Sequence, residues 1–306
     1  MTLAAGITWA VYVAHGLIMP LLLAGFIRAG KARLQNRRGP SVRQPFWDLA
    51  KLLGKGETIS ETTTWVFRWS PVIGTAAMAP IALMVPWLGV GSPLPGDLFL
   101  VVYLAAAGKF ASGLAALDPG SSFGAIGASR EAAVSVQAEP ALVIGLAALA
   151  AHAHSSSFQV FLSPRQAGPH LAVVIPLVIV ALWLAVTADL ARMPVDDPAT
   201  HLELTMIHEA LVLENSGRNL ALVELAVGLK TVVLFGLVAQ VILIPWRPLP
   251  DSWAYLASMG LIVAGGAVVA AAESVLVKLR WRRIPNLLSF AITAAALACL
   301  VVAVKG

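Results

Sequence analysis

Residues 171–189 read LAVVIPLVIVALWLAVTAD, a run of nineteen positions whose only ionisable side chain is the final Asp189. A helix of about 20 apolar residues is long enough to cross a hydrocarbon core of about 30 Å. Lipid offers no partner to unpaired backbone groups, so only helices and closed barrels can span it. This stretch therefore predicts a transmembrane helix.

The whole chain has the composition of a membrane protein. Of its 306 residues, 58% are hydrophobic and only 12% are charged, against about 45–50% and about 25% in soluble domains. We therefore expect an all-α polytopic fold with eight transmembrane helices, additional loop helices, and one integral membrane domain over residues 1–306. The predicted spans are residues 4–27, 68–90, 97–117, 132–152, 171–189, 219–245, 253–276 and 284–304.

The distribution of basic residues predicts the orientation of the bundle. Sixteen of the 21 lysines and arginines lie in the loops after spans 1, 3, 5 and 7, and three lie in the loops and terminus on the opposite side. The positive-inside rule places the basic side in the cytoplasm. We expect a multi-pass protein of the inner (plasma) membrane with both termini outside. Its cytoplasmic loops would be about residues 28–67, 118–131, 190–218 and 277–283.

Cysteine usage and net charge restrict the chemistry further. The single cysteine, Cys299, lies in an apolar run, so the chain offers no disulfide framework, zinc knuckle or iron–sulfur site. Topology explains the net charge of +5, so nucleic acid is not an expected partner. We expect no cofactor, no metal and no catalytic residue in this chain.

The first cytoplasmic loop contains a candidate interfacial helix, Ser41–Lys55 (SVRQPFWDLAKLLGK). Pro45 suits a first helical position, and an apolar face alternates with a polar face that carries Asp48 and Lys51. Two interpretations stay open. The helix is either a peripheral anchor with Trp47 among the lipid headgroups, or a docking surface for a soluble partner.

A second cytoplasmic helix is predicted in the loop around residues 190–218. Asp197 followed by Pro198 is typical of an N-cap and a first helical residue, and Gly217 of a helix stop, which gives a helix of about 17 residues.

Two pairs of polar residues return to nearly one face of that helix: His201 with His208, and Glu203 with Glu214. Their spacing is not that of HExxH, so we interpret them as a polar or docking face and not as a metal site. The candidate docking residues of the two loops are Arg37, Arg38, Asp48, Lys51, His201, His208 and Glu209.

Ionisable residues inside the spans form the third group of candidates. A charge at the bilayer centre costs about 2.5–3.5 kcal/mol on insertion scales, so each needs a partner or a path to water. Snorkelling or ion pairing is the simple interpretation, and we prefer it for Lys109. Several carboxylates at similar depth favour a proton path, in which Lys230 is the expected partner of Glu139. The set is Lys109, Glu139, Glu224, Lys230 and Glu273, with Asp189 at a span end.

Three cytoplasmic motifs, in this order, resemble the membrane subunit 1 family of respiratory complex I. They are Arg37–Lys55 (RRGPSVRQPFWDLAKLLGK), Gly127–Glu139 (GASREAAVSVQAE) and Asp189–Gly217. Within that family, the stretch 191–217 (ARMPVDDPATHLELTMIHEALVLENSG) is most similar to formate hydrogenlyase subunit 4 and hydrogenase-4 component C, from membrane-bound nickel–iron hydrogenases.

The resemblance implies a non-catalytic subunit that anchors a hydrogenase and couples it to the membrane. Its implied partners are the hydrogenase large and small subunits, which would carry the nickel–iron centre and iron–sulfur clusters, antiporter-like membrane subunits, and the lipid bilayer. The subunit would relay redox energy to the translocation of protons or sodium ions. The expected relay residues are Glu139, Glu224, Lys230, Glu273, Asp189, Arg130, Arg192, Asp196, Glu203 and Glu214.

Two other functions would also suit a polytopic membrane chain. The first is a quinone-site subunit of a NADH:quinone oxidoreductase. The stretch 198–204 reads PATHLEL where the complex I version reads PEAESEL, and the loss of two acids argues against it. The second is a free-standing ion transporter, which the docking-type loops and the absence of a visible internal repeat disfavour.

The predicted orientation can be tested by labelling. Single cysteines introduced near residues 45 and 205 should be protected from an impermeant thiol reagent added outside intact cells, because both loops are expected in the cytoplasm. Labelling after the membrane is permeabilised is the control. Labelling of either position in intact cells would contradict the orientation.

Overall fold

A computed structural model describes residues 3–87, 92–162, 170–197, 206–246 and 249–305. Within these ranges every regular element is helical, and eight helices are long and apolar enough to cross a membrane. The predicted all-α fold class is confirmed. The eight are α1 (Leu3–Leu34), α3 (Trp65–Met84), α4 (Leu98–Leu117), α5 (Ser122–His152), α7 (Leu171–Asp189), α9 (Gly217–Leu243), α10 (Asp251–Val275) and α11 (Ile284–Lys305).

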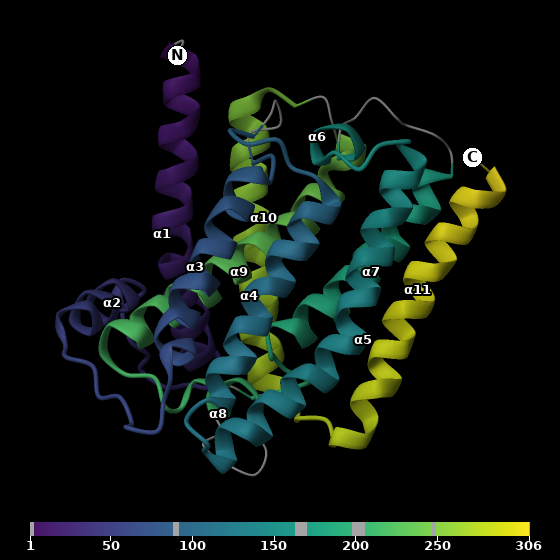
Figure 1. Ribbon diagram of the computed structural model, residues 1–306. Helices are drawn as coiled ribbons and strands as arrows, with labels where there is room; N and C mark the ends of the chain where they lie inside the picture. Colours follow the sequence, from purple (N-terminus) through teal and green to yellow (C-terminus); the bar gives the residue numbers. More distant parts are fainter. Residues whose placement is uncertain (1–2, 88–91, 163–169, 198–205, 247–248, 306) are drawn as a thin grey trace.

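Short helices occupy the connections. They are α2 (Gln44–Gly54), α6 (Phe158–Phe161), α8 (His208–Val212) and the 3₁₀ turns η2 (Ile244–Trp246) and η3 (Trp281–Arg283). Both chain ends lie at one end of the bundle, and α2 and α8 lie at the other (Figure 1). An even number of spans requires this arrangement.

Helix α9 is the centre of the bundle. It packs against α1, α2, α3, α7 and α10, and its residues 231–241 are buried without interruption. A helix that is apolar all round is expected inside a bundle. On one side α1 pairs with α10, and on the other α5, α7 and α11 pack together. The remaining two helices, α3 and α4, pack against each other. Helix α3 also packs against α9, and α4 packs against α5.

A glycine fixes the place of α2 against α1. A Cβ atom on Gly25 would lie 2.0 Å from the backbone oxygen of Val42, in the segment that leads into α2. Only glycine permits so close an approach of the two backbones, so the segment that leads into α2 lies directly against α1 at Gly25. Pro45 is buried at the start of α2, close to the predicted first helical position.

The predicted faces of α2 need one correction. The sequence predicts that Asp48 and Lys51 share one polar face. In the structure the Asp48 carboxylate faces Arg28 of α1 at 3.7 Å, beside Leu49 and Leu52 on the inner face. The exposed side of α2 carries Trp47 and Lys51 instead.

The predicted helix of about 17 residues is wrong over the described part of the loop. Residues 198–205, which include His201 and Glu203, lie outside the described residues. After them, α8 is helical only from His208 to Val212, and Gly217, with φ of +52°, begins α9. Met206 and Ile207 are buried in the bundle, so this segment folds onto α5 and does not stand free in water.

Candidate functional site

The first group of ionisable residues lies where α4, α5, α7 and α9 meet. We call it the Asp189 cluster: Lys109, Glu139, Asp189 and Lys230. The Lys109 ammonium contacts the Asp189 carboxylate and lies 2.6 Å from Glu139 Oε1, and Lys230 Nζ lies 2.9 Å from Asp189 Oδ2. Two cations therefore balance two carboxylates, as charges removed from water require.

The position of Asp189 at the end of α7 explains part of this arrangement. The last carbonyls of a helix lack partners within it, and they form the negative end of its dipole. Lys230 donates to the backbone oxygen of Asp189 at 2.9 Å as well as to its side chain. One lysine of α9 thus caps α7 and neutralises its terminal carboxylate.

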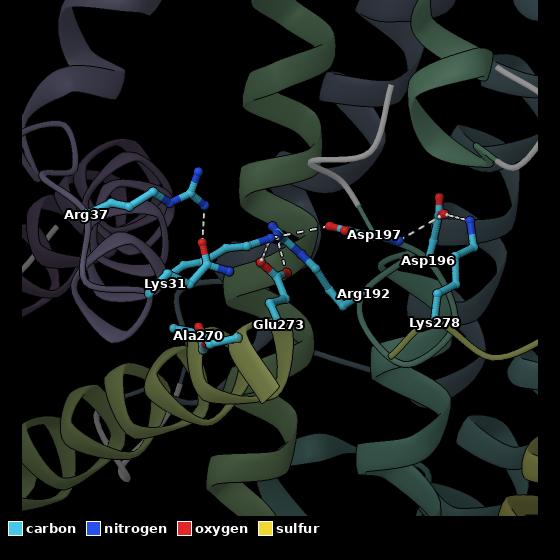
Figure 2. Close-up of polar contacts among 10 residues, drawn as sticks. Lys31, Arg37, Arg192, Asp196, Asp197, Ala270, Glu273 and Lys278 are labelled. Carbon is cyan, nitrogen blue, oxygen red and sulfur yellow. Dashed lines mark hydrogen bonds and ion pairs between the residues drawn. The ribbon is translucent and has the colours of Figure 1, made fainter. Parts of the chain in front are cut away.

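A second group lies closer to the end of the bundle that carries α2 and α8. We call it the Glu273 cluster: Lys31, Arg192, Asp197 and Glu273 (Figure 2). Glu273 is in the last turn of α10, and its side chain is only 2% exposed. Its two carboxylate oxygens lie 3.3 Å from Lys31 Nζ and 3.1 Å from Arg192 Nη1, and Lys31 also lies 3.3 Å from Asp197 Oδ1. The cluster joins α1, α10 and the segment after α7.

Asp196 organises the segment between α7 and α8. Its carboxylate accepts hydrogen bonds from the backbone N–H of Ile207 at 2.9 Å and of Asp197 at 3.0 Å, and it pairs with Lys278 (Figure 2). The side chain is almost fully buried. It therefore holds Ile207, at the start of the segment that leads into α8, beside Asp197 after α7.

A polar chamber of about 380 Å³ opens between α1, α2, α9 and the segment after α7. Charged side chains line it together with the apolar face of α2. Arg28 bridges two of its walls, 3.7 Å from Asp48 and 3.8 Å from Glu224. The other ionisable residues on its walls are Lys31, Arg192, His208, Glu209 and Glu273.

This chamber shares walls with a smaller cavity on which three residues of the Asp189 cluster lie. The smaller cavity, of about 80 Å³, is bordered by Lys109, Asp189 and Lys230. Leu190, Ala191, His208 and Val227 line both cavities. Ionisable groups thus continue from the chamber, past this shared wall, to Asp189 and Lys109, and Lys109 contacts the partly exposed Glu139 of α5.

Several predicted site residues lie in these groups, with different partners from those expected. Glu139 pairs with Lys109, and the predicted pairing with Lys230 is wrong, because Lys230 of α9 pairs with Asp189 instead. Lys109 is ion-paired, which is one of the two interpretations given for it.

Other predicted relay residues lie apart from the two clusters. Arg130 donates to the Met206 carbonyl at 3.0 Å. Glu224 faces Arg28 beside the chamber, and Glu214 is exposed on the turn after α8. Glu203 lies outside the described residues.

Sequence reasoning missed Lys31, Asp197 and Lys278 as members of the site. Lys31 and Lys278 were counted only as cytoplasmic charges, and Asp197 was interpreted as an N-cap. One signal was available for Lys31: it lies on the last turns of a transmembrane helix, where a buried acid of a neighbouring helix is within reach.

Among the residues that the structure describes, no group of three or more His, Cys, Asp and Glu side chains could hold a metal ion. Of the two histidines in the 190–218 loop, His208 is described, and it lies on the chamber wall.

Comparisons with known proteins agree over most of the chain. A family model described as NADH dehydrogenase matches residues 7–304. Formate hydrogenlyase subunit 4 of Escherichia coli (strain K12) is 35% identical over 269 residues, which cover 85% of this chain and 86% of that protein. Hydrogenase-4 component C of the same organism is 31% identical over 223 residues, covering 72% of this chain and 70% of that protein.

A solved structure has the same fold. One chain of the membrane-bound sulfane sulfur reductase, an archaeal respiratory membrane complex, superposes with a TM-score of 0.82. The match covers 98% of this chain and 100% of the other at 18% sequence identity, so it shows the fold alone.

The charge balance of the Asp189 cluster gives a testable stability difference. Asp189→Asn leaves Lys230 without a carboxylate and should destabilise the protein by about 3–5 kcal/mol, as removal of one partner of a buried pair does. The double variant Asp189→Asn with Lys230→Met removes both charges, while Lys109 keeps Glu139, and should recover at least half of the loss. The measurement is the thermal unfolding midpoint of the purified protein. Equal losses in the single and double variants would contradict the pairing.

Proposed function

The chain belongs to the NADH dehydrogenase family, and from that membership we propose that it is the membrane-anchoring and energy-coupling subunit of a complex I-like membrane-bound nickel–iron hydrogenase. It is a multi-pass membrane protein. The observation that carries the proposal is the series of ionisable groups that connects the chamber beside α2 with the partly exposed Glu139 of α5.

The anchoring role is supported by the end of the bundle that carries α2 and α8. There the loop after α2 is tied to the turn before α9: Thr58 N donates to Ser216 Oγ at 2.8 Å, and Ser216 Oγ donates to Thr58 O at 2.9 Å. A Cβ atom on Gly217 would lie 2.4 Å from Gly56 O, so the two loops touch. They form one fixed surface, on which we place the hydrogenase large and small subunits with their nickel–iron and iron–sulfur centres.

The coupling role is supported by the exposure of Glu139. Its side chain is 41% exposed although it lies within a transmembrane helix, about 13 Å along α5 from Arg130 at 1.5 Å per residue. A carboxylate facing lipid is costly, so a polar surface of another membrane subunit or water must cover it. We propose that an antiporter-like membrane subunit meets the bundle here, between α4 and α5.

In this scheme the residues of the chain hold and pass charge. A change in the protonation or position of a group beside the chamber alters the charge balance of the Glu273 cluster. Leu190, Ala191 and His208 form the wall between the chamber and the smaller cavity at Asp189. Lys109 links Asp189 to Glu139 by contacting both carboxylates. The chain thus acts as a proton or conformational relay and makes no covalent intermediate.

The cellular placement follows from the same proposal. A hydrogenase that faces the cytoplasm requires α2 and α8 on that side, which agrees with the excess of basic residues in the loops there. We propose the inner (plasma) membrane as the location, with both termini outside.

A quinone-binding role is the second candidate function, and the chamber is the observation that favours it. A volume of about 380 Å³ falls within the range of about 300–1,000 Å³ typical of small-molecule sites. Its walls combine the apolar side of α2 with charged groups. Inhibition of the purified complex by quinone analogues, competitive with added quinone, would favour this function over the hydrogenase role.

Docking on α2 can be tested with two matched tryptophans. Trp47 on α2 and Trp246 at the opposite end of the bundle are both 71% exposed. Trp47→Ala together with Lys51→Ala should reduce co-purification of the hydrogenase subunits about tenfold or more, since a buried interface tryptophan contributes about 2 kcal/mol or more. Trp246→Ala should have no effect. Normal recovery of the subunits with the α2 variant would leave α2 as a lipid anchor only.

The relay role of Glu139 can be tested by removing its charge. Glu139→Gln keeps shape and hydrogen bonding. We expect normal assembly and normal hydrogenase activity with an artificial dye, while turnover coupled through the membrane falls about tenfold or more, equivalent to about 1.4 kcal/mol on the barrier. Both activities are measured on one preparation.

One control accompanies this variant. Glu139→Asp keeps a titratable carboxylate and should retain most of the coupled turnover. Joint loss of assembly and dye activity would make Glu139 a structural ion-pair partner. Unchanged coupled turnover would place the relay elsewhere.

A further inference from the structure

A second large cavity, of about 630 Å³, lies outside the proposed relay, where α5 meets the loop between α10 and α11. Its walls include Ser129 and Arg130 from α5 and Lys278, Arg280 and Trp281 from the loop. The position is at the α8 end of the bundle, away from the surface formed by α2. None of these loop residues takes part in the proposed path of charge from the chamber to Glu139.

The charge of this cavity is strongly positive. Arg130, Lys278 and Arg280 are on its walls. Lys278 is paired with the buried Asp196. Arg280 is exposed at the mouth, and the Met206 carbonyl is among the groups that Arg130 contacts. The cavity therefore suits an anion with several oxygen acceptors, such as a phosphate group.

The surroundings of the cavity place it at the boundary between lipid and water. Helix α10 ends as a membrane span at Val275, and the next span begins at Trp281. Between them Val275, Leu276 and Val277 are exposed apolar residues, and Trp281 is exposed beside them. Tryptophan is enriched at the headgroup level of membranes. Exposed valines and leucine that would be unfavourable in water can contact acyl chains there.

We propose that this cavity binds the headgroup phosphate of an anionic phospholipid from the adjacent leaflet. Arg130, Lys278 and Arg280 would contact the phosphate, Trp281 would lie at the level of the glycerol, and the acyl chains would extend along Val275 and Val277. A basic pocket next to transmembrane helices on the positively charged side of a membrane protein is suited to such lipids. The lipid would join α5 to the loop between α10 and α11.

Free phosphate shares the headgroup chemistry, but it would leave the apolar residues beside the cavity uncovered. A soluble protein partner is the other possible occupant. The acyl-chain surface favours a lipid over both, and the experiment below separates the three.

The test uses the whole purified complex in nanodiscs that contain either phosphatidylcholine alone or phosphatidylcholine with phosphatidylglycerol, with retained lipid measured by native mass spectrometry. The wild type should retain an anionic lipid that the double variant Arg130→Gln with Arg280→Gln binds about tenfold or more weakly, since each basic side chain near an anionic surface contributes about 1 kcal/mol. The single variant Arg280→Gln changes only an exposed residue. It should show a smaller loss in the same direction, even if the double variant assembles poorly.

The matched control is Arg282→Gln with Arg283→Gln, which removes the same charge from the same loop outside the cavity wall. It should retain the lipid. Equal lipid retention by the wild type and both cavity variants would overturn the proposal. Displacement of the lipid by millimolar inorganic phosphate alone would indicate a free-anion site, and selective loss of a soluble subunit from the cavity variants, with lipid retained, would indicate a protein interface.

Discussion

The structure depends on one constraint: a charge carried into a membrane-spanning bundle must find its partner inside the protein. Asp189 illustrates it, because its carboxylate at the end of α7 is held by lysines from α4 and α9. Each lysine in turn fixes the helix that carries it. Protein cations here take the place of the water that would otherwise solvate the carboxylate. Removing any one member of such a group therefore leaves another charge buried without a partner. The same ion pairs that allow the charges to be buried therefore set how these helices meet.

The ionisable clusters lie towards one end of the bundle, and apolar packing dominates at the other. Towards the end that carries the termini, the bundle is closed by apolar packing, for example where the ring of Trp87 occupies the space beside Gly236. Towards the other end, the Glu273 cluster, Asp196 and the chamber hold the α7–α8 segment against α1 and α10. The ion-paired clusters thus lie towards the end that carries α2 and α8, which suits a subunit proposed to transmit a change between partners.

The two cavities lie one after the other between α2 and the Asp189 cluster. The chamber borders α2, where a soluble partner is proposed, and the smaller cavity borders the Asp189 cluster, which ends at the partly exposed Glu139. His208 and the residues just after α7 are common to both. A signal from one surface to the other needs to cross only this shared wall. The cationic cavity beside Trp281 lies off this route, which is consistent with a separate role towards lipid.

The sequence alone determined the all-α class, the number and order of the eight spans and the family, because these depend on local hydropathy and on contiguous motifs. Some span ends were misplaced: the span predicted from residue 132 begins at Ser122, and the one predicted to end at residue 27 continues to Leu34. It also identified most of the ionisable residues of the site, since a charge within an apolar run is visible in one dimension. Only the tertiary structure decided the pairing: Glu139 with Lys109, Lys230 with Asp189, and Lys31 with Glu273. Partners on different helices are separated by 30 to 242 positions, so their contact depends on how the helices pack and on no pattern along the chain.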